Sequence, residues 1–296
     1  MLTSLSPHTR AVLQAFFVTF LWSTSWVLIK IGLKDIPAVT FAGLRYSLAF
    51  LCLVPLVMRS DTAQAIRQLS RAEWRRLVTL GVVMIAVAQG AQYLALDHLP
   101  AVTLSLLLNF TTILVALLGI ALLGEHPTWL QWGGIGLYLI GVLAYFYPAA
   151  IPSGQVIGLA FAALCLAGNA LGTTLGRSIN RAGVVSPLTV TAVSMGIGAA
   201  IMLTSGIAAQ GLPALSLSAC AIIAWLAVVN TAFAFTLWNH TQRTLSAVES
   251  SIINNTMMIQ IAVLAWLFLD ETISAQEIAG MVLAGVGSLI VQLHPR

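Results

Sequence analysis

The sequence has 296 residues, of which 59% are hydrophobic and only 7% are charged, with a formal net charge of +4. A water-soluble domain carries about a quarter charged residues because its surface must face water, so this composition excludes a soluble fold and predicts an integral membrane protein. The mean hydropathy of +0.97 agrees with this, and the pI of about 9.3 does not indicate nucleic acid as a partner, because basic residues beside membrane spans are expected in any case.

The lengths of the apolar runs predict where the chain crosses the membrane. A helix needs about 20 mostly apolar residues to span the hydrocarbon core, and lipid leaves backbone polar groups no partner outside the helix. We therefore expect an all-α bundle of ten transmembrane helices joined by short loops. The expected spans are 11–32, 38–57, 77–96, 100–123, 128–147, 155–176, 185–205, 217–238, 246–269 and 274–293. No cleaved signal peptide is expected, because the opening MLTSLSPHTR is polar and the first apolar run is long enough to span.

The first span contains the stretch LWSTSW at its middle. Trp22 and Trp26 are four residues apart and share a helix face, with Ser23 beside Trp22. Trp22 lies too deep for an interfacial belt, so we predict that these residues line a central cavity, with plain packing as the alternative. Lys30, near the outer end of the span, either lines the same cavity or extends to the interface.

The second span carries Arg45, which lies about 12 Å below the outer surface at ~1.5 Å rise per residue. An ionisable residue at this depth faces the bundle interior and marks a functional site by default. Arg45 is expected either to be held by helix carbonyls or to attract an anionic group such as a substrate carboxylate. A structural pairing with Glu277, near the outer end of the last span, is the alternative.

Uncharged polar residues recur in the middle of several spans. Unpaired amides are unfavourable in hydrocarbon, so these side chains either bond between helices or line a wet cavity for a small polar solute. The set consists of Gln89, Gln92, Tyr93, Asn109, Asn169, Asn230, Trp238, Asn254 and Asn255.

The distribution of basic residues predicts the orientation of the chain. With the N-terminus inside, the inner segments hold ten of the 13 lysines and arginines, the outer loops hold Lys34, and Lys30 and Arg45 lie within spans. We therefore expect a multi-pass protein of the cell inner membrane. By the positive-inside rule, both of its termini are expected in the cytoplasm. The inner residues are Arg10, Arg59, Arg67, Arg71, Arg75, Arg76, Arg177, Arg181, Arg243 and Arg296.

The chain also repeats itself after 146 positions. The shift places Asn109 on Asn255, Glu125 on Glu271, and two glycines of the fifth span on two of the tenth, without a gap from residue 99 to 143. We therefore expect two five-helix halves, 1–150 and 151–296. Because five is odd, the second half enters the membrane from the opposite side, as in the inverted repeats of secondary transporters.

Glu125 and Glu271 stand in tight turns at opposite membrane faces. Their structural interpretation is that each carboxylate accepts hydrogen bonds from the free N–H groups that open the next helix. A role in transport, such as proton coupling, is the alternative.

The stretches FLWSTSWVLIKIGL, PAVTFAGLRYSLAF and YLALDHLPAVTLSLLLNFTTILVALLGIALLGE resemble the EamA family of the drug/metabolite transporter superfamily. The resemblance runs through both halves. It implies ten helices in an inverted five-plus-five arrangement and export of small metabolites, and within the family the chain resembles the YddG-like amino-acid exporters. Many members have proline where Thr112 and Met258 stand here. A kink caused by proline is therefore not expected in these two helices, and a kink there would need another cause, such as a glycine or a bound water.

These patterns favour a secondary transporter that exports amino acids or similar metabolites by alternating access, proton-coupled or facilitated, as a monomer or weak dimer. Nucleosides and cationic compounds are alternative substrates. A membrane enzyme is disfavoured because no P-loop, H-E-x-x-H or G-x-S-x-G motif occurs, and a channel because no charged ring or filter loop is repeated. No cofactor or metal site is expected, since the three cysteines are dispersed in apolar runs.

Overall fold

The structure, a computed structural model, describes residues 6–59, 66–111, 113–114, 128–147, 153–182, 185–241, 244–245 and 247–293. This part of the chain is helical and contains no β-strand. When helices that continue directly into one another are counted together, it holds ten helical segments of nine residues or more, which confirms the expected number.

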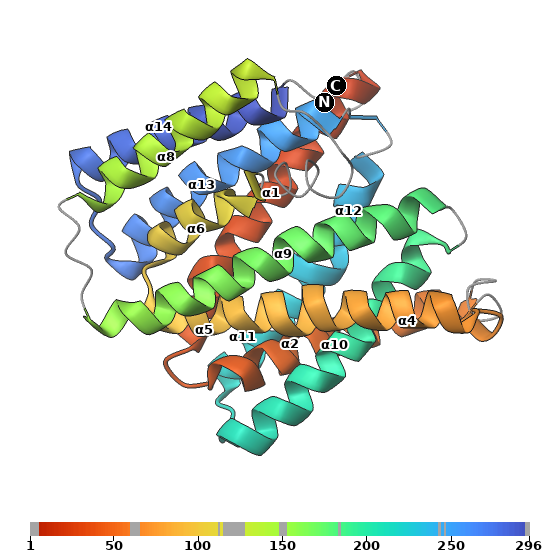
Figure 1. Cartoon of the computed structure of the whole chain (residues 1–296). Helices are drawn as coiled ribbons and strands as arrows, with labels where there is room; N and C mark the ends of the chain where they lie inside the picture. The colour runs from red at the N-terminus through yellow and green to blue at the C-terminus, as the bar shows by residue number, and fades with distance from the viewer. Residues whose placement is uncertain are drawn as a thin grey trace. The chain divides into compact units, whose positions relative to one another are not determined.

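The helices follow the expected spans closely (Figure 1). Those of the first half are α1 (Pro7–Gly32), α2 (Ala38–Arg59), the continuous series α4 (Arg71–Leu80), η2 (Gly81–Gln89) and α5 (Gly90–His98), then α6 (Ala101–Asn109) and α8 (Trp129–Phe146). After a short 3₁₀ turn, η3 (Ser153–Gln155), the second half has α9 (Val156–Ala182), α10 (Pro187–Gln210), the series α11 (Leu217–Ala227), η4 (Val228–Phe233) and α12 (Ala234–Thr241), then α13 (Ala247–Leu269) and α14 (Ala275–Leu293).

Capping residues explain where several helices begin. Ser70 opens α4 with a capping box: its hydroxyl accepts from the N–H of Glu73, whose carboxylate accepts from the N–H of Ser70. This helix therefore starts six residues before the apolar run that predicted it. Thr128 and Gln131 form the same motif at the start of α8.

Six of the described helices are long and apolar enough to cross a membrane: Pro7–Gly32, Ala38–Met58, Arg71–His98, Trp129–Phe146, Val156–Gly176 and Leu188–Gln210. Leu217–Phe233, Ile253–Leu269 and Ala275–Val291 are shorter apolar helices. The predicted span 100–123 is described only as far as residue 114.

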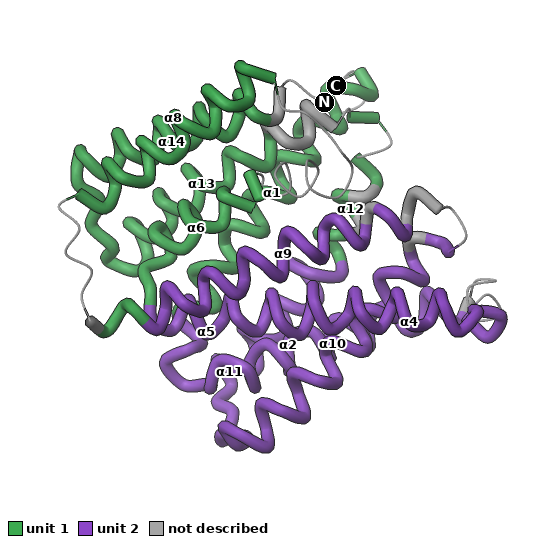
Figure 2. Tube along the Cα trace, in the orientation of Figure 1, with its two compact units in different colours: residues 1–30, 99–156, 233–296 green, residues 31–98, 157–232 purple. Residues whose placement is uncertain are grey.

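The chain forms two compact units, each built from both halves of the sequence (Figure 2). Unit 1 contains residues 1–30, 99–156 and 233–296, and unit 2 contains residues 31–98 and 157–232. The predicted halves 1–150 and 151–296 are a division by sequence repetition and do not coincide with this division by contact.

In unit 1, α8 and α14 pack together through glycines. A Cβ on Gly134 would lie 2.8 Å from the carbonyl oxygen of Gly287, and one on Gly141 would lie 2.6 Å from that of Gly280. Such close approach requires residues without side chains. Gly134 corresponds to Gly280 and Gly141 to Gly287 in the 146-residue repeat. Gly134 therefore contacts the counterpart of Gly141, and Gly141 contacts the counterpart of Gly134. Reciprocal contacts of this kind indicate a two-fold relation between antiparallel helices, as inverted repeats require.

In unit 2, α2 packs antiparallel to α10. A Cβ on Gly43 would lie 2.5 Å from the Cα of Leu203, and one on Gly206 would lie 2.6 Å from the backbone nitrogen of Thr40. These helices are the second of each half, so they repeat the antiparallel pairing that α8 and α14 show in unit 1.

Two π-helical segments occupy corresponding places in the two halves. Shifting η2, residues 81–89, by 146 positions gives 227–235, which includes η4 at 228–233. A π-helical turn is rare and is frequent at functional sites, because it redirects the side chains that follow. Both segments lie beside the buried polar group described next.

Candidate functional site

Among the side chains of unit 2 that the structure describes, the most buried charge is the guanidinium of Arg45 on α2, a side chain that is 6% exposed. Its Nε donates to the hydroxyl of Thr231 at 3.0 Å, and its Nη1 donates to the phenol oxygen of Tyr93 at 3.2 Å. Its Cζ lies 5.4 Å from the ring centroid of Tyr46, within cation–π range. The prediction that Arg45 faces the interior is consistent with this burial.

Local structure fixes the partners of Arg45. Thr231 lies in η4, and its hydroxyl donates to the carbonyl of Leu226 at 2.8 Å, five residues back, as the wider π-helical turn allows. Tyr93 is fully buried, and its ring meets Phe41 edge-on at 5.2 Å between centroids. Both oxygens are therefore held in place before any ligand arrives.

A second pair extends the group toward η2. The phenol of Tyr46 donates to Oε1 of Gln89 at 2.7 Å, which leaves the Gln89 amide nitrogen available as a donor. Gln92 lies three residues further along the same helix and is half-buried, as Gln89 is. The predicted residues Arg45, Gln89 and Tyr93 thus belong to one polar group.

The partners that the described residues provide to Arg45 are all uncharged. Its hydrogen bonds go to a threonine and a tyrosine, and among the described residues it forms no ion pair with a carboxylate. A buried charge is unfavourable unless it is paired. A guanidinium with neutral partners is suited chemically to bind an anion, and a planar carboxylate matches its fork of N–H groups.

Two other predicted residues of unit 2 have different surroundings. Asn169 on α9 donates to the sulfur of Cys165 at 3.4 Å, one turn back on its own helix. Asn230 is fully buried in η4, directly before Thr231. Tyr46 and Thr231 were not singled out from the sequence, although each is adjacent to a residue that was.

In unit 1, a chain of polar side chains joins α1 to α13. The hydroxyl of Ser23 donates to Oε1 of Gln260 at 3.0 Å, and Nε2 of Gln260 donates to the hydroxyls of Thr256 at 3.1 Å and Thr19 at 3.3 Å. The prediction singled out Ser23 but missed Gln260, Thr19 and Thr256. An amide within the apolar run IQIAVLAW was the signal that could have identified Gln260.

Trp22 is the centre of an aromatic cluster in unit 1. Its ring centroid lies 5.2 Å from that of Phe235 and 5.2 Å from that of Trp238, both in tilted geometry on α12. The structure therefore brings together two predicted residues, Trp22 and Trp238. Trp26, one turn further along α1, is buried at 8% exposure.

Lys30, at the end of α1, reaches the chain just before α6. Its Nζ donates to the carbonyl of Leu99 at 2.7 Å, and the side chain is partly buried. The residue at the N-cap of α6 is Pro100, which provides no side-chain cap. The first N–H groups of α6 therefore need an acceptor from elsewhere.

Glu271 provides that acceptor. Its Oε1 accepts from the N–H of Ala101 at 2.8 Å, and its Oε2 accepts from the N–H of Val102 at 3.2 Å. The backbone of Asp270 just before it is left-handed, with φ of 55°, which ends α13 and turns the chain. The carboxylate also complements the positive end of the α6 dipole.

The helix that Glu271 caps differs from the expected one. The sequence predicts a cap on the helix that follows, but α14 is capped by Ser274 and Glu277, which exchange bonds between side chain and backbone at 3.2 and 2.6 Å. The local capping box serves α14 and leaves Glu271 to bond a helix 170 residues away. The corresponding Glu125 lies outside the described residues.

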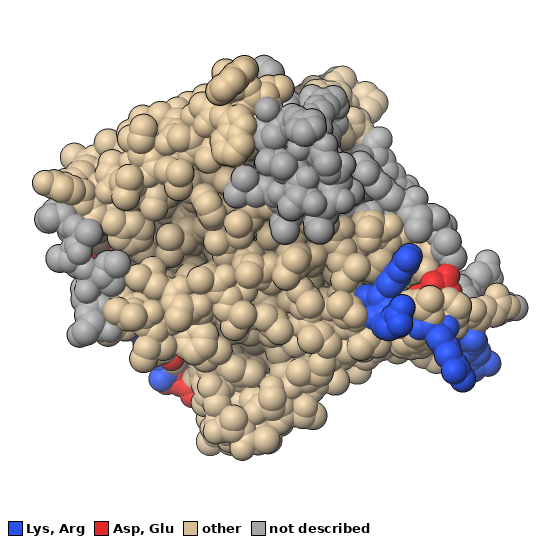
Figure 3. Space-filling model, in the orientation of Figure 1, with Lys and Arg blue, Asp and Glu red and all other residues tan. Residues whose placement is uncertain are grey.

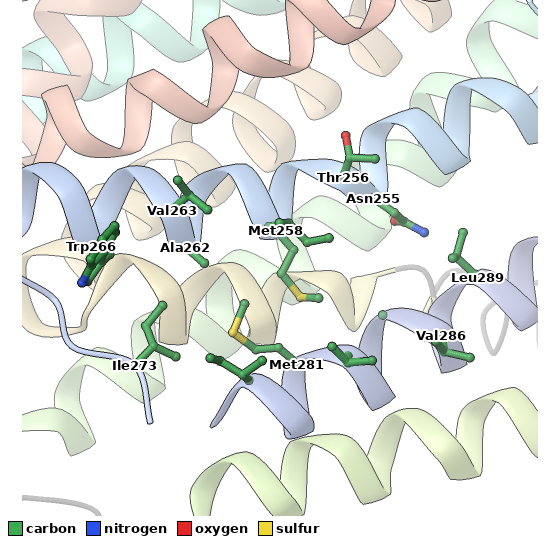
Figure 4. A pocket seen from close by; sticks show the side chains of 14 residues that line it. Asn255, Thr256, Met258, Ala262, Val263, Trp266, Ile273, Met281, Val286 and Leu289 are labelled. Atoms are coloured by element: carbon green, nitrogen blue, oxygen red, sulfur yellow. The ribbon is translucent and has the colours of Figure 1, made fainter. Parts of the chain in front are cut away.

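Three predicted asparagines lie on α6 and α13. Asn109 donates to the carbonyl of Ser105 at 2.9 Å, within its own helix. Asn254 is exposed, and Asn255 lines a groove of about 630 Å³ between α13 and α14 (Figure 4). The other side chains of the groove are almost all apolar, with Met258 and Met281 between the helices. Such a lining does not suit a polar solute.

Comparison with known proteins gives one consistent result. The model of the EamA-like transporter family matches the chain twice, over residues 9–147 and 156–293. The uncharacterized transporter YvbV of Bacillus subtilis (strain 168) is 26% identical over 286 residues, 94% of this chain and 90% of its own, and the uncharacterized transporter YoaV of the same organism is 21% identical over 282 residues, 94% of this chain and 95% of its own. A crystal structure with 18% sequence identity covers 97% of this chain and 98% of its own with a TM-score of 0.69, which indicates a shared fold.

Proposed function

The chain belongs to the EamA-like transporter family of the drug/metabolite transporter superfamily, and from this premise we propose that it is a secondary transporter that exports small polar metabolites, amino acids above all, across the inner membrane by alternating access. Two observations support the mechanism. The family's domain occurs twice in the chain, and the equivalent helices α2 and α10, like α8 and α14, run antiparallel to each other. Inverted copies provide two nearly equivalent packings that open to opposite sides.

The observation that carries the substrate class is the buried guanidinium of Arg45, whose partners within the described part of the chain are uncharged. In this proposal the carboxylate of the solute is its counter-ion. Tyr93 and Thr231 hold the guanidinium in a fixed orientation, so little freedom is lost when the carboxylate binds. Amides at Gln89 and Gln92 offer hydrogen bonds to the remainder of a polar solute.

The remaining predicted positions are assigned to the path of the solute. They are Asn169 and Asn230 in unit 2, and Trp22, Ser23, Trp26, Lys30, Asn109, Trp238 and Asn254 in unit 1. Asn255 is not assigned to this path, because the groove that it lines is almost entirely apolar. Glu271 is assigned a structural role at the start of α6, because both of its oxygens are used there. The arginines around the start of α4 support cytoplasmic termini through the positive-inside rule.

One observation favours a second substrate class. The rings of Trp22, Phe235 and Trp238 form an aromatic cluster, and aromatic faces attract organic cations. Under this alternative the protein exports cationic compounds, and Arg45 would hinder rather than help their passage.

Flux measurements with the purified protein in liposomes test the proposal. The panel contains an amino acid, its amide, the amine that lacks the carboxylate, a nucleoside and a quaternary ammonium ion. Saturable flux of the amino acid that is at least tenfold faster than that of its amide supports a carboxylate carrier. Preference for the amine or the quaternary ion would support the alternative, and ion currents beyond carrier turnover would indicate a channel.

A further inference from the structure

The start of α4 and the residues just before it carry an unusual concentration of positive charge. Arg67, Arg71, Arg75 and Arg76 are all exposed and lie within ten residues of sequence. In the space-filling view, basic atoms gather at the α4 end of the molecule, whereas most other described atoms on that face are uncharged (Figure 3). Few charges occur elsewhere in this chain, so the cluster requires an explanation.

The geometry of α4 separates a core face from a free face. Leu77 and Leu80 are buried in a hydrophobic cluster with Ile179, Val185 and Val190 of α9 and α10 and the segment between them. At about 100° per residue, Arg71, Arg75 and Val78 lie on the opposite side of the helix, and all three are exposed. Packing in unit 2 therefore holds the helix and directs two guanidinium groups outward.

The acid in α4 does not neutralise this face. The carboxylate of Glu73 accepts from the N–H of Ser70 at 2.6 Å as part of the capping box, and its electrostatic partner is Arg76 on the same flank. In the part of the chain that the structure describes, Arg71 and Arg75 form no ion pair. Both guanidinium groups are therefore available to an external anion.

Apolar side chains lie directly beside these arginines. Val78 follows Arg75 by one turn on the same face, and Trp74, 38% exposed, flanks it. The helix then continues as an apolar stretch to His98 that is long enough to cross a membrane. Along the helix, Trp74 thus lies between the two arginines and apolar residues follow them, so the cationic groups are at the end where headgroups lie and the apolar groups are on the side of the acyl chains.

We propose that the Arg71–Arg75 face of α4 binds the phosphate headgroup of an anionic phospholipid. The guanidinium groups bond the phosphate oxygens, and Trp74 and Val78 contact the glycerol and the upper acyl chains. A free phosphate would use only the arginines, whereas the adjoining aromatic and apolar groups match a lipid. Basic clusters beside a membrane span attract anionic headgroups by about 1 kcal/mol per residue, or about fivefold in affinity.

Native mass spectrometry of the full chain in detergent, titrated with phosphatidylglycerol, tests this site. We expect the R71Q/R75Q variant to bind phosphatidylglycerol about 25-fold more weakly than the parent protein. The charge-preserving R71K/R75K variant is expected to retain most of the binding. R10Q/K34Q is the matched control, because it removes two exposed cations elsewhere and should change binding less than twofold.

Two further measurements keep the outcome clear if R71Q/R75Q folds poorly. In the parent protein, phosphatidylglycerol binding should weaken as salt is raised from 0.05 to 0.5 M, while phosphatidylcholine binding stays low and unchanged. Inorganic phosphate at millimolar concentration should not displace the lipid. Equal loss in the control variant, equal binding of phosphatidylcholine, or full displacement by inorganic phosphate would each overturn the proposal.

Discussion

Replacing Arg45 by methionine tests whether the charge of this residue binds the substrate or stabilises the fold. The substitution removes two hydrogen bonds, at 3.0 Å to Thr231 and 3.2 Å to Tyr93, each worth about 1.5–3 kcal/mol because the donor is charged. It also removes the unfavourable desolvation of a buried charge, which amounts to several kcal/mol. Thr231 keeps its bond to the carbonyl of Leu226, and Tyr46 keeps its bond to Gln89 but loses the cation–π contact. The phenol of Tyr93 loses the hydrogen bond from Arg45.

These opposing contributions nearly cancel, so we expect the stability of the Arg45→Met protein to lie within about 2 kcal/mol of the parent. Binding should respond differently. The substrate carboxylate would lose a charge-assisted contact of about 1.5–3 kcal/mol, which corresponds to a rise in KM of about 10- to 150-fold. Flux of the corresponding amide should change far less, because the amide carries no negative charge.

The assay is initial-rate flux in liposomes, together with the thermal unfolding midpoint in detergent. Arg45→Lys retains the charge, but one ammonium group cannot reproduce the guanidinium fork, so an intermediate KM is expected. Lys34→Met is the matched control, since it removes an exposed cation. A large fall in the unfolding midpoint of Arg45→Met with an unchanged KM in the folded fraction would refute the reasoning and make Arg45 a structural residue.

Three other predictions concern unit 1. Gly141→Leu should lower the free energy of unfolding by about 3 kcal/mol, because its Cβ would clash with the backbone nitrogen of Ala284, whereas Gly136→Leu on the same helix has open space and should be tolerated; equal effects in thermal unfolding would contradict this packing. Glu271→Ala should cost about 1–2 kcal/mol through the uncapped α6, and Glu271→Gln less; faster amide exchange at the start of α6 is the readout, and unchanged exchange would argue against the cap. Gln260→Leu leaves three hydroxyl groups of α1 and α13 without their amide partner and should lower the free energy of unfolding by about 1–3 kcal/mol; a more stable variant in thermal unfolding would show that the amide serves the solute instead.

Hydropathy and local capping make the helices predictable. A long apolar run in lipid must satisfy its backbone groups within itself, so it becomes a helix whatever its neighbours are. The expected span 274–293 is thus matched by α14 at Ala275–Leu293. Where the prediction fell short, as for the earlier start of α4, a capping box visible in SRAE explains the difference.

The 146-residue repeat also predicted which glycines of the two halves correspond, and the structure shows what these glycines do. The glycines aligned by the 146-residue shift are those that bring α8 and α14 into backbone contact. The shift itself, however, gives only which residues correspond. It does not show that Gly134 contacts Gly287 rather than Gly280, because that depends on the direction in which the two helices run.

The sequence alone determined the helical segments, their number and the residue types that do not suit lipid, because these depend on contacts within a few residues. Tertiary structure alone decided the partners. Arg45 meets Thr231 across 186 positions, and Glu271 caps α6 rather than α14. Such pairings depend on where helices from distant parts of the chain come to lie and on the direction of each side chain. Local patterns carry information on neither.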